Sequence, residues 1–128
     1  MTNSMDPIGK RLWAIAGGNI PLETNGIEPA FTSRDTISIL NVNDRDARLK
    51  LSVYFENEEP IEPYHIVVKA ERVCRIWFND LIDPLPLNLN KPFSCVIRSD
   101  IPVVVQFSRM DTSSASTAIT GTIAFDSD

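Results

Sequence analysis

The stretch FNDLIDPLPLNLNKPFSCVIRSDIPVVVQFSRMD, from Phe78 to Asp111, decides the fold that this sequence predicts. It places a proline-rich loop before two apolar runs, 93–98 and 103–108. Alternate side chains of an extended strand share a face, so the second run presents apolar groups on both faces. The strand therefore buries most of its surface, yet it delivers Gln106, Arg109 and an aspartate to its end. Polar groups on the rim of a rigid sheet are a common way to build a binding site.

The same two-residue period runs through most of the chain. It is clearest at Ala47–Phe55, where apolar residues at odd positions alternate with mostly polar ones, as in an antiparallel strand with one buried face. Turn formers such as Asn25-Gly26 and Asn43-Asp44, together with prolines, separate the runs. The sequence thus predicts an all-β fold, a single antiparallel β-sandwich of jelly-roll-like character with about eight strands. The predicted strands are Arg11–Ala16, Thr36–Asn41, Ala47–Phe55, Tyr64–Lys69, Val73–Phe78, Phe93–Arg98, Val103–Ser108 and Ala118–Phe125.

Length and composition limit the class of protein. A chain of 128 residues, 43% hydrophobic and 23% charged, is expected to form one globular domain over 1–128. We expect Met1–Asp6 to be a flexible leader and Trp13–Phe125 to be the sandwich. The net charge of −5 and the scattered basic residues disfavour a nucleic-acid surface. Because no run resembles a signal peptide or approaches the ~20 apolar residues of a membrane span, we expect a cytoplasmic protein without membrane insertion.

Catalytic and metal-binding motifs are weak. His65 is the only histidine and sits in the middle of a predicted strand, so an ordinary strand histidine is favoured over a catalytic one. No CxxC pair or second histidine supplies a metal site, and we predict no metal and no cofactor. Cys74 and Cys95 are predicted to be free thiols, as is usual in a reducing compartment. We therefore predict a protein that is not an enzyme.

Two features of the chain have both a structural and a functional interpretation. Arginines that border apolar runs, such as Arg109, form either local ion pairs or a pocket for an oxygen-rich ligand. Trp13 either packs in the core, as strand tryptophans commonly do, or forms an aromatic floor under a sugar. The sequence alone leaves both alternatives open.

Several segments together resemble one known family. They are FNDLIDP from Phe78, SCVIRSDIP from Ser94, VVVQFSRMD from Val103, WAIAGGNIP from Trp13, NGIEPAF from Asn25, SILN from Ser38, YFENEEP from Tyr54 and PYHIVVKAER from Pro63. The sequences of these segments and their order along the chain resemble the sensory rhodopsin transducer family of small soluble bacterial proteins. The resemblance covers Trp13–Phe125. Trp77, where the family would suggest a basic residue, and Glu62, where it would suggest glycine, depart from the pattern.

The resemblance implies a non-enzymatic, cytoplasmic signal-transducing or binding module. It implies a homotetramer, for which Trp77 and Phe107 are candidate contacts, and a partner at the cytoplasmic face of a sensory rhodopsin. A sensor of a small carbohydrate-like ligand without a rhodopsin partner is the alternative. Two further classes have no motif behind them: a sugar-modifying enzyme using Asp80, Asp83 or Asp111, and a DNA-associated regulator.

The predicted ligand-binding residues are the polar or amphipathic members of the segments that carry the resemblance. We expect them to converge at one end or face of the sandwich, with Arg109 gripping oxygen atoms through its guanidinium fork. Trp13 would form an apolar floor, and Asp80 with Glu28 would orient Arg109 or accept from ligand hydroxyls. The full set is Trp13, Glu28, Arg34, Asn79, Asp80, Gln106 and Arg109.

Overall fold

The protein is an antiparallel β structure built around one long strand. The computed structural model describes residues 8–18, 34–82, 84–86, 91–111, 118–123 and 125–126. The strands are β1 (Lys10–Gly18), β2 (Arg34–Asn41), β3 (Ala47–Phe55), β4 (Ile61–Val68), β5 (Arg72–Trp77), β6 (Phe93–Asp111), β7 (Ala118–Ile123) and β8 (Phe125–Asp126). One short 3₁₀ turn, η1 (Phe78–Asp80), follows β5.

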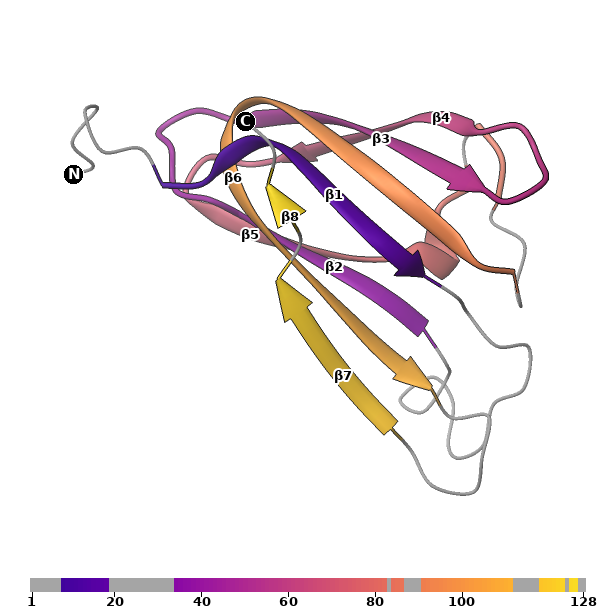
Figure 1. Ribbon diagram of the computed structural model, residues 1–128. Coiled ribbons are helices and arrows are strands. Elements are labelled where there is room, and N and C mark those ends of the chain that lie inside the picture. The colour runs from indigo at the N-terminus through magenta and orange to yellow at the C-terminus, as the bar shows by residue number, and fades with distance from the viewer. Residues whose placement is uncertain are drawn as a thin grey trace.

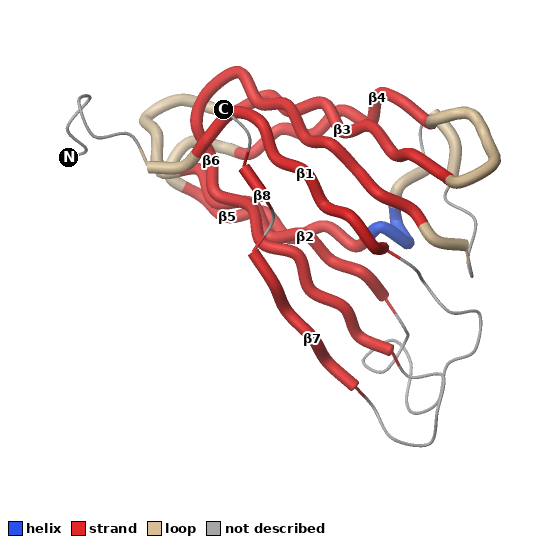
Figure 2. The backbone as a smooth tube through the Cα atoms, viewed as in Figure 1, coloured by secondary structure: helices blue, strands red, loops and turns tan. Residues whose placement is uncertain are grey.

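Strand β6 belongs to both layers of the fold (Figure 1). Its first half pairs with β1 and β3 in a first sheet, ordered β4-β3-β6-β1-β8. Its second half pairs with β2 and β7 in a second sheet, ordered β5-β2-β6-β7. All these pairings are antiparallel, and the curled sheet folds its two halves over one another (Figure 2). The predicted all-β sandwich is thus confirmed.

The described residues form eight strands, but these strands do not correspond one to one with the predicted runs. The runs 93–98 and 103–108 were expected to be two strands, but they form one continuous strand of 19 residues, β6. The run 118–125 is instead divided between β7 and the two-residue β8. Pro102 suggested a break in the sequence. It lies where β6 passes from one sheet to the other, at a position with no partner among the described pairings, so its missing N–H interrupts no ladder.

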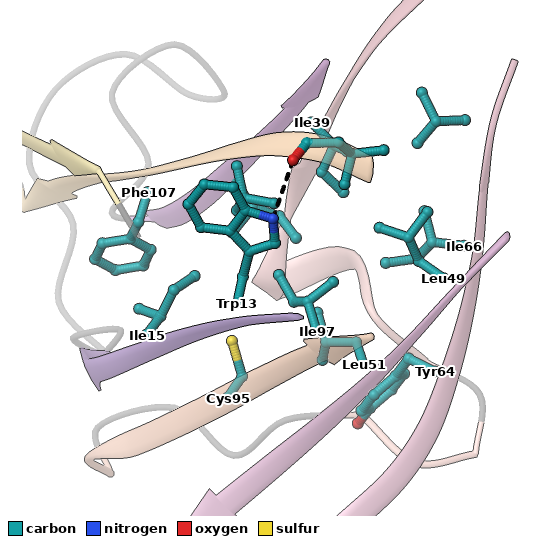
Figure 3. Close-up of a cluster of buried hydrophobic side chains, with 14 of the residues drawn as sticks. Trp13, Ile15, Ile39, Leu49, Leu51, Tyr64, Ile66, Cys95, Ile97 and Phe107 are labelled. Atoms are coloured by element: carbon teal, nitrogen blue, oxygen red, sulfur yellow. Dashed lines mark hydrogen bonds between the residues drawn. The ribbon is translucent and has the colours of Figure 1, made fainter. Parts of the chain in front are cut away.

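The core fills the space between the two layers. Odd-numbered residues of β2, β3 and β6 point inward, as the two-residue period requires, so Ile37, Leu51 and Val105 are fully buried. Phe78 from η1 packs against Phe93 and Phe107, with ring centroids 5.0 and 6.3 Å away. Figure 3 shows side chains from both sheets meeting around Trp13.

The corner where β6 changes sheets is fixed by β1. The indole Nε1 of Trp13 donates hydrogen bonds to the carbonyl oxygens of Lys10 (3.0 Å) and Val103 (3.1 Å). The register of β1 against β6 shifts between Lys10 and Leu12, at this same corner. Gly9 has a φ of +96°, and a Cβ there would lie 2.2 Å from the Val103 oxygen. Glycine is therefore required for the backbones to approach so closely.

A second polar cluster lies beside the same corner, at the β2–β3 turn. The fully buried Asn41 side chain donates from Nδ2 to the carbonyl oxygens of Arg45 (2.9 Å) and Val68 (3.1 Å). Its Oδ1 accepts from the side chain of Asn43 at 2.8 Å, and Asn43 also donates to the Pro102 oxygen at 2.8 Å. One buried amide thus connects the β2–β3 turn to the end of β4 and, through Asn43, to β6.

Candidate functional site

The structure brings four of the predicted residues to one end of the second sheet. Arg34 begins β2, and in the antiparallel register the neighbouring Asp35 lies opposite Arg109 of β6. On the other side of β2, Thr36 pairs with Trp77, the last residue of β5. Asn79 and Asp80 belong to η1, which directly follows β5 and contacts β2. The start of β2 and the ends of β5 and β6 therefore coincide, as antiparallel pairing requires.

Asp35 is the residue at this end that the sequence analysis missed as a site residue. It is fully buried at 0% exposure and lies opposite Arg109 in the β2–β6 pairing. A buried carboxylate is costly unless it is hydrogen bonded or paired with a charge, so such groups mark places where polar interactions are concentrated. The signal was present in the sequence, because Asp35 shares odd-numbered parity with Ile37 and Ile39, which point into the core.

Gln106 lies on the outer face of the same sheet. It pairs with Ser38 of β2, and Ser38 pairs on its other side with Arg75 of β5. Gln106 and Arg75 are exposed, while Ser38 is half-buried. These three side chains form a polar row across three strands. The adjacent row holds Trp77, Thr36 and Ser108.

Trp13 is not part of this exposed end. Its ring is 4% exposed and packs in the core near Ile15, Ile39 and Phe107 (Figure 3), with its N–H donated to two backbone carbonyls. The core-packing alternative accounts for this position, and an aromatic floor open to a ligand does not. Phe107, a predicted contact between subunits, is likewise only 6% exposed and faces inward, because it has the same parity as Val103 and Val105. The expectation that Phe107 contacts another subunit is therefore wrong.

Two predicted aspartates lie near the same end of the fold. Asp80 of η1 is exposed, and Asp111 ends β6, two residues beyond Arg109 and opposite Ala118 of β7. Glu28 and Asp83 lie outside the described residues.

A hollow that the sequence did not suggest lies beside the β3–β4 hairpin. It has a volume of about 400 Å³ and is lined by Phe55, Glu58, Glu59, Ile61, Leu85 and Pro86. The Lys91 ammonium lies 2.6 Å from the Glu58 carboxylate, and the Tyr64 hydroxyl donates to the Leu85 carbonyl. These contacts tie 84–86 and the start of β6 to the hairpin. The hollow contains none of the predicted ligand-binding residues.

The thiols are poorly suited to nucleophilic chemistry. Burial raises the pKa of the Cys95 thiol from its ordinary value of 9.0 to about 12, and burial also raises the pKa of Cys74. A thiol is reactive as its thiolate, so both shifts reduce reactivity. Within the described residues, no group of three or more His, Cys, Asp or Glu side chains could hold a metal ion. No helix among those residues is long and apolar enough to span a membrane.

The fold and this surface define a small antiparallel β-sandwich module with polar groups gathered at one end of one sheet. The family model of the Anabaena sensory rhodopsin transducer matches residues 8–126, and the chain belongs to this family. The predicted resemblance is therefore confirmed.

Two solved structures are similar to the chain. The Anabaena sensory rhodopsin transducer shares 44% identity and a TM-score of 0.75, with 83% of this chain and 92% of that chain covered. A Thermotoga maritima protein, described as Thermotoga maritima 1070, shares 26% identity and a TM-score of 0.78, with 92% and 95% covered. A comparison with curated protein sequences found no significant match.

Proposed function

We propose that this protein is a non-enzymatic, cytoplasmic signalling module that binds a membrane photoreceptor of the sensory rhodopsin class. The observation that carries the proposal is the family match over residues 8–126, together with 44% identity to a protein named as the transducer of such a receptor. The described strands also carry exposed polar rows that can serve as a contact surface, such as the row of Gln106, Ser38 and Arg75.

Charge supports a partner of this kind. The cytoplasmic loops of membrane proteins carry an excess of lysine and arginine, whereas this chain has a net charge of −5. Opposite net charges increase the rate of encounter and restrict its orientation, and the effect weakens as salt screens it. Association with the receptor should therefore slow as the ionic strength rises.

The test is direct binding to detergent-solubilised Anabaena sensory rhodopsin immobilised on a biosensor, in darkness and under illumination. We expect saturable association whose rate falls between 50 and 300 mM salt, and whose affinity differs between the two illumination states. A variant that combines Gln106→Ala with Arg75→Ala tests whether the outer face of the second sheet forms the contact with the receptor. An absence of binding in both illumination states, measured beside the Anabaena transducer as a positive control, would overturn the proposal.

We also propose that the protein assembles as a homotetramer. With Phe107 buried in the core, the candidate contacts are Trp77 and an apolar row of the second sheet on the far side of the polar row formed by Gln106, Ser38 and Arg75. Leu40 and Val73 are 41% and 60% exposed, and both lie in one row with Val104. Contiguous exposed apolar groups on a sheet face are typical of interfaces. Light scattering after size exclusion measures the mass, and a monomer at micromolar concentration contradicts the assembly.

A second candidate function is recognition of a small carbohydrate-like ligand at the end of the second sheet. The buried Asp35, which pairs with Arg109 in the register of β2 and β6, favours it, since a buried carboxylate marks a place where polar interactions are concentrated. We expect Arg109→Ala to remove any melting shift that a panel of mono- and disaccharides produces while the oligomer remains assembled. If no sugar in the panel shifts the melting temperature of the unmodified protein, this candidate is rejected.

A further inference from the structure

The outer face of the first sheet carries a row of basic side chains drawn from three strands. Lys50 of β3 lies directly opposite His65 of β4 on one side and directly opposite Arg98 of β6 on the other. Leu12 of β1 lies opposite Arg98 and completes the row. Lys50, His65 and Arg98 are all exposed, because their parity is opposite to that of the buried Leu51, Tyr64 and Ile97. We call Lys50, His65 and Arg98 the basic row.

Such an arrangement is unfavourable in the isolated protein. Side chains directly opposite one another on adjacent antiparallel strands have Cβ atoms about 4.5–5.5 Å apart, and like charges at this spacing destabilise a sheet. Lys69–Asp46 and Lys91–Glu58 are ion pairs within the described part of the chain, and neither includes a member of the row. The row therefore retains a repulsion that an anion placed between Lys50 and Arg98 would remove.

Carboxylates border the row and limit what it can accept. On one side Asp100 accepts a hydrogen bond from the backbone N–H of Arg48 at 2.9 Å. On the other, Glu62 accepts from the Ser52 hydroxyl at 2.7 Å. Both acids would repel a broad anionic surface such as a nucleic-acid backbone. A compact anion can lie along the row, where the three basic residues span about 10 Å over three strands.

We propose that the basic row is a binding site for a phosphate-type oxyanion. The guanidinium of Arg98 offers planar paired donors, the ammonium of Lys50 offers a mobile charge, and the His65 ring adds a further hydrogen-bonding group. The oxyanion belongs either to a free phosphate compound or to a lipid headgroup at the membrane surface. This site lies on the first sheet and is separate from the polar end of the second sheet, so it does not depend on the proposed function.

The experiment compares melting temperatures in sodium pyrophosphate and in sodium chloride at matched ionic strength and pH. An exposed three-residue site is expected to bind with a dissociation constant on the order of 1 mM. At 10 mM pyrophosphate, such an affinity raises the melting temperature of a chain of this length by about 5 °C. The test variant is Lys50→Gln with Arg98→Gln. The control variant is Arg72→Gln with Arg75→Gln, which removes the same charge from exposed positions on β5.

Two results are expected together. The test variant melts at the same or a higher temperature than the unmodified protein in chloride, because the repulsion is gone, and it loses the pyrophosphate shift. The control variant keeps that shift. Amide chemical-shift changes confined to β3, β4 and the first half of β6 locate the anion independently of stability.

Each other outcome overturns the proposal. A pyrophosphate shift shared equally by all three proteins indicates a general salt effect. No shift in the unmodified protein excludes the site at this affinity. Once the site is established, sedimentation with vesicles that contain phosphatidic acid, compared with pure phosphatidylcholine vesicles, distinguishes the two sources of the phosphate group. Loss of receptor binding in the biosensor test would leave these results unchanged, so the two proposals fail separately.

Discussion

Replacing Trp13 with phenylalanine should destabilise the protein strongly, because this side chain fixes the corner of β6. Its indole N–H donates to the carbonyl oxygens of Lys10 and Val103, and its ring is 4% exposed. Phenylalanine keeps an aromatic ring at the position but supplies no donor. The hydrogen bonds to both carbonyls would be lost together at the point where β6 passes between the two sheets.

The magnitude follows from two contributions. The smaller ring leaves a void of roughly 40 Å³, which costs about 1 kcal/mol at ~24 cal/mol per Å³. A buried carbonyl that loses its donor costs about 1–3 kcal/mol. The free energy of unfolding should therefore fall by about 2–4 kcal/mol. Single domains commonly have a free energy of unfolding of about 5–15 kcal/mol, so the variant should still fold.

Urea unfolding followed by far-ultraviolet circular dichroism measures this change. We expect a lower midpoint with an unchanged slope, since the surface exposed on unfolding stays the same. Trp77→Phe is the matched control. Because Trp77 is only half-buried, this substitution should lower the free energy of unfolding clearly less. A loss below about 1 kcal/mol for Trp13→Phe, or one no larger than that of the control, would contradict the structural role argued for Trp13.

Four further predictions concern other parts of the chain. Gly9→Ala should lower the melting temperature by several degrees, since its Cβ would lie 2.2 Å from the Val103 oxygen at a φ of +96°; a scanning calorimetry trace unchanged by the substitution contradicts this close approach. Asn41→Leu should lower the free energy of unfolding in urea by about 2–4 kcal/mol, because several partly or fully buried polar partners lose their amide at once. A neutral result would mean that the Asn41 cluster does not hold the turns together. Iodoacetamide at pH 8 should modify Cys74 faster than Cys95, whose burial raises its pKa to about 12, and mass spectrometry that shows equal rates rejects this order. The pKa of Cys95 in the folded protein exceeds its ordinary value of 9.0, so the contribution of the protonated thiol to stability is complete below pH 9. That contribution declines by about 1.4 kcal/mol per pH unit toward pH 12. If the stability of Cys95→Ala declines equally steeply over this pH range, groups other than Cys95 cause the loss.

The two-residue period predicted the strands well, because a strand that is buried on one face has an apolar residue at every second position. The predicted run Ala47–Phe55 is the observed β3. The period could not show that 93–98 and 103–108 are one strand, because Pro102 normally ends pairing. Whether a proline breaks a strand depends on whether a neighbour needs its N–H, and at the corner of β6 no described neighbour does.

The candidate site was predicted in part for a similar reason. Arg34, Asn79, Asp80 and Arg109 were expected together because they are polar members of the segments that carry the family resemblance, and antiparallel pairing places the ends of their strands side by side. Trp13 was misplaced at that site because a strand tryptophan has the same sequence signature in a core as on a surface. Its partner Val103 lies 90 residues away, and this separation is fixed only by the pairing of β1 with β6.

Cross-strand rows are the level of organisation that the sequence conceals most completely. Lys50, His65 and Arg98 are single basic residues within three unrelated segments, and each has an ordinary role when its own strand is considered alone. Register makes them neighbours, and a slip of one residue in either pairing would turn one of them toward the core. The buried faces of β3, β4 and β6 forbid that slip, since Leu51, Tyr64 and Ile97 would then be exposed. The packing of the core therefore fixes the position of the charges outside it, which is why the basic row follows from the fold although no segment of the chain encodes it.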